Sequence, residues 1–225
     1  MNKKVYVIQL LYGILFALYL KHCYESPFIF LAGKEGGFGL FEIVRWITLF
    51  LPVWAVVCFQ YEEAWMKKKL VVHRYRSPLK WWSHLQLQVI GSVGIAYLAF
   101  FFTLSLTLKF HITENEGKIM ALLVIHSVGL LAIGAILQMV WGKTLVTSMG
   151  LILLETFGVG NVLRRIIAPQ YMMFTWGMRN CERSMYGEGG YGIWWVIVLQ
   201  ISLFLLVSIP FGKLKKRVLT KKIEV

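Results

Sequence analysis

Six long apolar runs divide the sequence, and they decide what kind of fold the chain can adopt. A membrane-spanning helix needs about 20 predominantly apolar residues to cross a hydrocarbon core of about 30 Å. The runs of suitable length are Val5–Leu20, Ile43–Gln60, Leu85–Leu108, Ile119–Trp141, Thr144–Gly160 and Tyr191–Phe211. None alternates between apolar and polar residues as a barrel strand would. The sequence therefore predicts an all-α, polytopic membrane protein in which residues 1–225 form a single domain.

The distribution of basic residues predicts the orientation. With six spans and a cytoplasmic N-terminus, fifteen Lys and Arg residues fall on the cytoplasmic side and eight on the other. This bias favours cytoplasmic placement of both termini in a multi-pass protein of a cell membrane. It also accounts for the net charge of +13 through contact with anionic lipid headgroups, so we infer no nucleic-acid partner.

Several reaction classes are excluded by composition. The chain has no aspartate, which rules out an aspartyl-phosphate pump and an aspartic intramembrane protease. The sequence Trp141-Gly-Lys-Thr144 resembles the end of a phosphate-binding loop, but Leu137 stands where the first glycine belongs. The histidines and cysteines lack the spacing of metal ligands. We therefore expect no ATP hydrolysis by the chain itself, no catalytic residue, and no directly bound cofactor or metal.

Glu155 is the one carboxylate inside an apolar run. An ionisable residue at such a position is a functional hypothesis, because an unpaired charge in lipid is costly. His126, in the preceding run, lies at a similar depth when residues are counted at 1.5 Å each. The two side chains could pair, or both could face an outward cavity on a transport pathway. Alternatively, Glu155 could extend to the headgroups from a short helix.

The apolar part of the segment 161–192 is too short to span the membrane. We expect this segment to be an extracytoplasmic re-entrant segment that precedes the last span. Six tryptophans near span ends are interpreted as interface belts. They are Trp46, Trp194 and Trp195 on the outside, and Trp81, Trp82 and Trp141 on the inside. Glycines within the spans, Gly91 and Gly94 among them, are expected to permit close helix packing.

The cytoplasmic segment 61–84 is strongly basic, with six Lys and Arg residues and three tryptophans. Pro78 suits the first turn of a new helix. The segment could therefore hold a short helix on the membrane surface, anchored by Trp81 and Trp82. Composition alone favours an ordinary positively charged anchor over such a helix.

The motifs of this segment resemble those of a known family. Phe59-Gln-Tyr-Glu-Glu63, Leu70-Val-Val-His-Arg-Tyr-Arg-Ser77 and Lys80-Trp-Trp82 look like the exit of the second span and the coupling helix of small ABC-exporter permeases. These are the six-span, type-2 export permeases that include members from bacteriocin and lantibiotic clusters. The resemblance covers about 25 residues, and the layout of six spans with cytoplasmic termini is similar as well.

The resemblance implies a function. Glu62, Arg74, Arg76, Ser77 and Lys80 would contact a separate cytoplasmic ABC ATPase, which binds the ATP and Mg²⁺. Two permease copies, identical or homologous, would form a pathway for a hydrophobic or amphipathic cargo such as an antimicrobial peptide, in a bacterial plasma membrane. Two alternatives remain open, namely a non-transporting accessory or sensor subunit, and an intramembrane enzyme that uses Glu155 and His126.

Overall fold

The computed structural model describes residues 3–34, 37–66, 78–141, 143–160 and 166–220, and helices are the only regular secondary structure in them. The longer helices are α1 (Lys3–Cys23), α3 (Leu40–Leu49), α4 (Leu51–Met66), α6 (Pro78–Thr107), α7 (Glu114–Trp141), α8 (Thr144–Val159) and α11 (Ile193–Thr220). The shorter pieces are α2 (Pro27–Leu31), α10 (Arg183–Tyr186) and the 3-10 turns η2 (Pro169–Tyr171), η3 (Met173–Thr175) and η4 (Arg179–Cys181). The predicted all-α class is confirmed.

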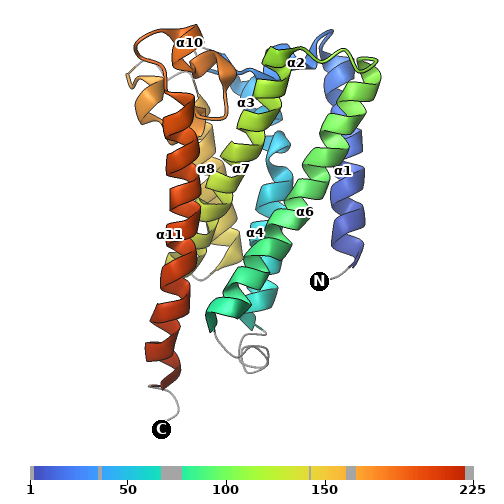
Figure 1. Cartoon of the computed structure of the whole chain (residues 1–225). Coiled ribbons are helices and arrows are strands. Elements are labelled where there is room, and N and C mark those ends of the chain that lie inside the picture. Colours follow the sequence, from blue (N-terminus) through green and yellow to red (C-terminus); the bar gives the residue numbers. More distant parts are fainter. Residues whose placement is uncertain (1–2, 35–36, 67–77, 142, 161–165, 221–225) are drawn as a thin grey trace.

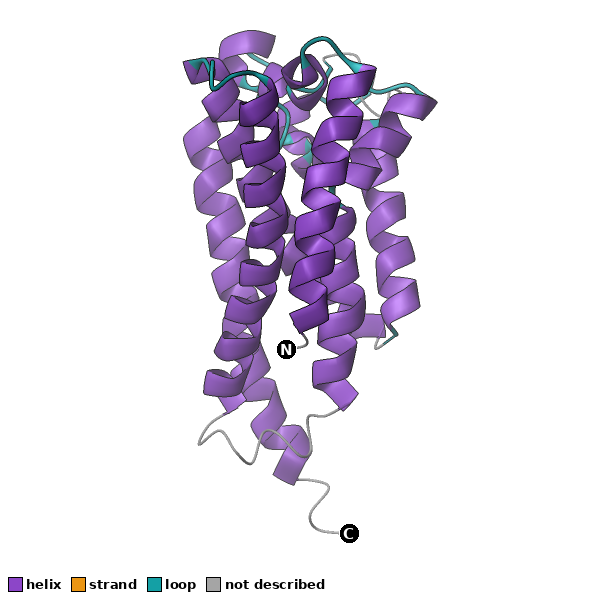
Figure 2. Ribbon diagram, turned by 90° about the vertical axis from the view of Figure 1, so that its right-hand side faces the viewer, coloured by secondary structure: helices purple, strands orange, loops and turns teal. Residues whose placement is uncertain are grey.

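The long helices lie side by side in one bundle (Figures 1 and 2). The start of α1 and the end of α11 lie at the same end of this bundle, together with the α4–α6 and α7–α8 junctions, by which we mean the helix ends on either side of residues 67–77 and of residue 142. We call this the terminal end. The opposite end carries α2, the α6–α7 connection and residues 166–192, which we call the cap.

Three helices are long and apolar enough to cross a membrane, namely Lys4–Cys23, Lys80–Thr107 and Glu114–Gln138. The pair α3 and α4 makes a fourth if its two halves form one bent span. The other two predicted spans correspond to α8 and to Ile193–Leu206 of α11, which are apolar but shorter. The structure is thus compatible with a membrane protein that has three to four membrane-length helices.

The predicted span Ile43–Gln60 is broken at Phe50, where the axes of α3 and α4 differ by 50°. Pro52 explains the break, since its ring has no N–H to offer the carbonyl of Thr48 and disfavours a continuous helix. The hydroxyl of Tyr12 on α1 donates to that Thr48 carbonyl instead. Gln9 donates to the carbonyl of Pro52 at 3.3 Å. Side chains of α1 therefore satisfy backbone groups at the break.

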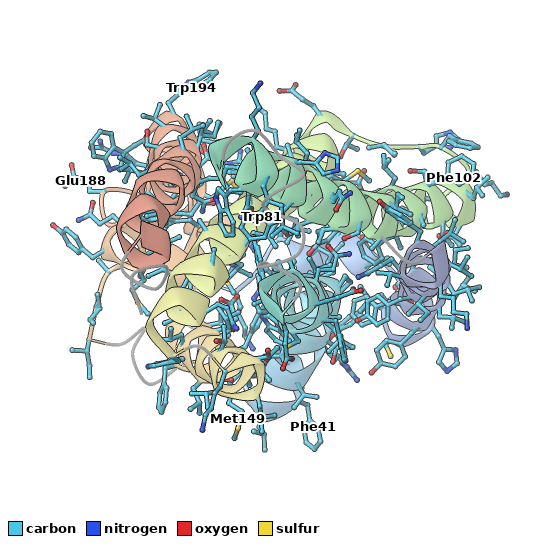
Figure 3. The ribbon with its side chains drawn as sticks, turned by 90° about the horizontal axis from the view of Figure 1, so that it is seen from below. Phe41, Trp81, Phe102, Met149, Glu188 and Trp194 are labelled. Atoms are coloured by element: carbon cyan, nitrogen blue, oxygen red, sulfur yellow. The ribbon has the colours of Figure 1, made fainter. Side chains whose placement is uncertain are left out.

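Large apolar side chains point outward around the bundle. Figure 3, seen from the terminal end, has Phe41, Phe102, Met149 and Trp194 at the perimeter, and all four are exposed. Trp81 lies in the interior of the same view and is buried. An apolar perimeter on this scale is typical of a surface that contacts lipid or other apolar chains.

The α4–α6 junction differs from the predicted surface helix. Residues 61–66 continue α4, and a helix does begin at Pro78, but it is the first turn of the long helix α6. Trp82 stacks on Tyr61 with ring centroids 5.7 Å apart, so this tryptophan ties α6 to α4 and does not anchor a separate helix. The interpretation of Trp81 and Trp82 as membrane-interface anchors is therefore wrong, since both are buried.

The described part of the cap consists of short turns that pack onto the bundle. Phe174 lies over Gly158 of α8, and Met173 contacts Gly129 of α7. Gly129 is fifteen residues into α7, or about 22 Å from its first residue at 1.5 Å per residue. The cap thus reaches well below Glu114, the residue at which α7 begins on this side of the bundle.

Candidate functional site

Three helices meet at the buried carboxylate of Glu155, near the end of α8. The side chain is 0% exposed, and its Oε1 accepts a hydrogen bond of 2.8 Å from Nε1 of Trp46 on α3. Nε2 of His126 on α7 lies 3.1 Å from the same oxygen. The structure therefore brings Glu155 and His126 together. The alternative in which Glu155 extends to the headgroups is contradicted by its complete burial.

His126 is enclosed by an aromatic ring and by the cap. The side chain is 1% exposed, and the ring of Phe50 meets the imidazole edge to face at a centroid distance of 5.1 Å. Gly177 of the cap lies so close that a Cβ there would be 2.9 Å from Cβ and Cγ of His126. Glycine is required at this contact, because any larger residue would force the cap away from the imidazole.

Two polar atoms of the pair have no hydrogen-bond partner. They are Oε2 of Glu155 and Nδ1 of His126. A buried polar atom without a partner costs about 1–3 kcal/mol, and more if it is charged. Native structures rarely keep such atoms unless they serve a function or bind a group that comes and goes. This pair is therefore the strongest candidate for a functional site in the described part of the chain.

An aromatic plug covers Glu155 toward the cap end. We use this name for Phe30, Phe38 and Trp46, whose ring centroids are 5.3 to 6.2 Å apart. Phe38 is held by its backbone N–H, which donates to the carbonyl of Val159 at 2.9 Å.

On the far side of the plug lies an open pocket of about 450 Å³, which we call the cap-end pocket. Phe30 and Phe38 contribute to its wall, as do Lys34 and Glu42, which form an ion pair of 3.5 Å. The two phenylalanines are thus shared between the plug and the pocket wall, and they separate the pocket from the buried pair.

The predicted ATPase-docking residues are only partly described. Glu62 and Lys80 are exposed near the terminal end, on α4 and α6 respectively. Arg74, Arg76 and Ser77 lie outside the described residues. The structure therefore leaves this predicted surface untested.

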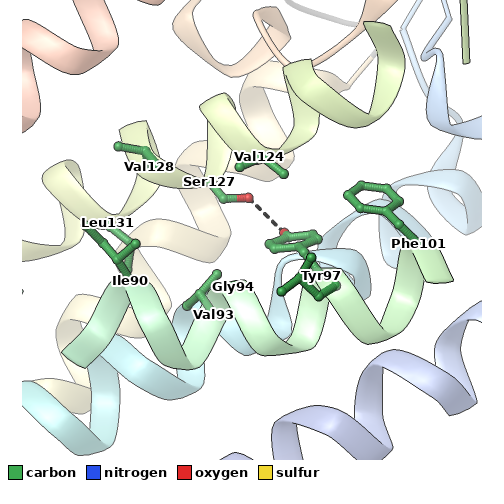
Figure 4. Close-up of a pocket in the computed structure, with 10 residues that line it drawn as sticks. Ile90, Val93, Gly94, Tyr97, Phe101, Val124, Ser127, Val128 and Leu131 are labelled. Carbon is green, nitrogen blue, oxygen red and sulfur yellow. Dashed lines mark hydrogen bonds between the residues drawn. The ribbon is translucent and has the colours of Figure 1, made fainter. Parts of the chain in front are cut away.

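A second cavity, of about 170 Å³, lies between α6 and α7. Figure 4 shows its apolar lining and its polar contact, the 2.8 Å hydrogen bond between the hydroxyls of Ser127 and Tyr97. Gly94 lines the cavity, and a Cβ on Gly94 or on Gly91 would meet nothing within 4 Å. The prediction that these two glycines permit close packing is therefore wrong within this chain.

Sequence reasoning missed Trp46. Its position near a span end suggested an interface belt, yet it is 0% exposed and bonded to Glu155. Trp141, Trp194 and Trp195 are exposed, as the belt interpretation requires. The signal that could have identified Trp46 is Pro52, because a helix break there gives the preceding helix α3, which carries Trp46, a different direction from α4.

No metal centre is found in the described segments, where no three His, Cys or Glu side chains lie close enough to hold an ion. The fold and the buried pair define a helical bundle that is compatible with a membrane protein and encloses a polar cluster. Comparison with known proteins matches no family model, no curated protein and no solved structure.

Proposed function

We propose that this protein is the membrane-spanning permease subunit of an ABC-type exporter in a bacterial plasma membrane. It moves a hydrophobic or amphipathic cargo, such as a peptide, and a separate cytoplasmic ATPase supplies the energy. In this proposal α8 and α11 complete six crossings, and the terminal end faces the cytoplasm. Helix α8 and the apolar part of α11 are shorter than usual spans. In this proposal the cap covers the backbone groups near their ends that would otherwise face lipid.

One observation carries the proposal, the gathering of basic segments at a single end of the bundle. The start of α1, the α4–α6 junction and the end of α11 all lie there. Together with residues 67–77 and 221–225 of the sequence, these segments contain fourteen of the 24 Lys and Arg residues of the chain. A basic end of this kind faces the cytoplasm under the positive-inside rule, and it offers a soluble partner a charged surface.

The α4–α6 junction is mechanically suited to receive a push from an ATPase. The helices on either side of it are both long, and near these helix ends the Tyr61 hydroxyl of α4 donates to Oε1 of Gln86 on α6 at 2.7 Å. The stacking of Trp82 on Tyr61 adds a second tie. Movement of the junction would thus turn α4 and α6 as one rigid body, the type of motion by which packed helices transmit a switch.

The experiment is a mild-detergent purification of the tagged chain from its native membranes, with co-purifying proteins identified by mass. We expect a stoichiometric soluble ATPase with the chain, and we expect the double substitution Arg74→Glu with Arg76→Glu to abolish its recovery. The matched control is Lys21→Glu with Lys109→Glu, an equal charge change near the cap end. Recovery of the ATPase with the first variant, or its absence from wild type, would refute the proposal.

Cargo-stimulated ATP hydrolysis in the purified complex distinguishes a permease from an accessory subunit, which would bind the ATPase without this stimulation. The enzyme alternative is less well supported by the geometry. Glu155 and His126 are close enough for acid–base chemistry, but a substrate would first have to displace the cap or the aromatic plug from them.

A further inference from the structure

The charge of the buried cluster depends on how many protons Glu155 and His126 carry. An ionised Glu155 beside a neutral His126 would place a net negative charge where neither side chain reaches water. The effective penalty for such a charge is several kcal/mol. One added proton, on either the carboxylate or the imidazole, makes the pair neutral. The enclosed cluster is thus electrically neutral when the two side chains share one added proton.

The other charged groups on the packed elements do not neutralise Glu155. In the described segments α8 carries no other charged residue, and α2 carries none. Those on α3 and α7 have partners of their own. These partnerships are Glu42 with Lys34, Arg45 with Tyr19 and Tyr24, Glu114 with Lys118, and Glu116 with Thr113. Of those in residues 166–192, Arg179 and Glu182 pair with each other, and Arg183 and Glu188 are exposed. The titratable groups of α4, which are Cys58, Tyr61, Glu62 and Glu63, lie toward the terminal end.

The geometry lets a proton move through the pair. Along the 3.1 Å contact, an N–H bond forms at Nε2 of His126 as an O–H bond breaks at Oε1 of Glu155, or the reverse. The two atoms without partners, Nδ1 of His126 and Oε2 of Glu155, are free to take a proton from hydronium or give one to water. No electrons are transferred, and the net change is one proton bound or released.

A route for that proton is built into the fold. Phe30 and Phe38 line the cap-end pocket, and both rings also contact Trp46, whose indole is bonded to Glu155. Helix α3 carries Trp46 and ends at the 50° bend next to Phe50, which itself packs on His126. Rotation of α3 about this bend would lift Trp46 off the carboxylate and admit water from the pocket.

We propose that Trp46, Glu155 and His126 form a proton-binding site, which exchanges one proton with the cap-end pocket when the aromatic plug opens. The ligand is a proton delivered by water. The inference does not depend on the ATPase, and it holds whether the chain is a permease, a sensor or another carrier.

A hydrophobic carbodiimide tests this directly, because it reacts with a protonated carboxyl in apolar surroundings and leaves a stable mass label. The full chain in its native membranes is treated over a range of pH, and labelling of the Glu155 peptide is quantified by mass spectrometry. We expect labelling at Glu155 that declines as the pH is raised. We also expect the pH profile to shift in His126→Gln, since the imidazole then no longer shares the proton.

The plug is tested with a matched pair of phenylalanines. Phe38→Ala should accelerate labelling by about tenfold if it lowers the opening cost by about 1.4 kcal/mol. Phe41→Ala on the same side of the bundle should not, because Phe41 is 81% exposed and touches neither the pocket nor the site. No labelling of Glu155 at any pH, or pH-independent labelling, would overturn the site. Equal rates in the two variants would overturn the route.

A second readout needs no reagent and no plug variant. Infrared difference spectra of the wild-type protein, recorded on raising the pH, should show loss of a carboxylic-acid band or of an imidazolium band. Glu155→Gln should remove this signal, whereas Glu116→Gln, at a half-buried position outside the cluster, should leave it unchanged. A signal that persists in Glu155→Gln would refute the proposal.

Discussion

Replacing Trp46 by phenylalanine is the sharpest test of the buried cluster. The change removes the indole N–H that donates to Glu155, and a hydrogen bond to a charged group contributes about 1.5–3 kcal/mol. The smaller ring also leaves a void beside Phe38 and Phe50, at a cost of about 1–2 kcal/mol, less than the 3–5 typical of full truncation. We expect a loss of about 3 kcal/mol, or roughly a hundredfold in the unfolding equilibrium constant.

The assay is equilibrium unfolding in mixed micelles by titration with a denaturing detergent, followed by circular dichroism. Trp194→Phe is the matched control, because Trp194 is 78% exposed and surface changes usually stay within about 0.5 kcal/mol. A double-mutant cycle with Glu155→Gln isolates the hydrogen bond. The two losses should be non-additive by about 1 kcal/mol or more. If Trp46→Phe behaved like the control, or if the cycle were additive, the reasoning about the cluster would be refuted.

The same titration tests two further contacts. Gly158→Ala should destabilise by about 1–3 kcal/mol, because a Cβ there would lie 2.3 Å from Cβ of Phe174, whereas Gly91→Ala should be neutral or stabilising by up to about 1 kcal/mol. Equal effects would contradict the packing of the cap on α8. Tyr97→Phe should cost only about 1 kcal/mol, because it removes a hydrogen bond between neutral groups and Ser127 keeps the carbonyl of Leu123 as a partner. A loss of stability as large as that of Trp46→Phe would show that the charge of the acceptor does not determine how much a hydrogen bond contributes.

The helices could be predicted from the sequence because their cause is local. Long apolar runs and the scarcity of charges inside them produce α1, α6 and α7 nearly as expected. The break at Phe50 was missed, although Pro52 was visible, since a proline inside an apolar run can also be tolerated as a kink. The surface helix was misplaced for a similar reason. Pro78 does begin a helix, but only tertiary contact with Tyr61 reveals that this helix continues into α6.

The site was harder to predict because its contacts are remote in sequence. Glu155 and His126 could be suspected from their matching depths, since each is an unusual residue in an apolar run. Trp46 is 109 residues from Glu155, and its role depends on which face of α3 turns inward. Gly177 gives no chemical signal at all. Its importance lies in the side chain that it lacks, which only the position of the cap over His126 explains.

The two proposals meet physically at α4. This helix begins beside Phe50, which packs on His126, and it ends sixteen residues later near the α4–α6 junction, about 24 Å away at 1.5 Å per residue. A continuous helix of that length transmits displacement, so a push at the junction would alter the packing of Phe50 on the imidazole. By linkage, proton binding would change the affinity for the ATPase by the same factor by which ATPase binding changes the affinity for the proton. The two proposals can nevertheless fail separately, because carbodiimide labelling of Glu155 requires no partner and ATPase recovery requires no proton.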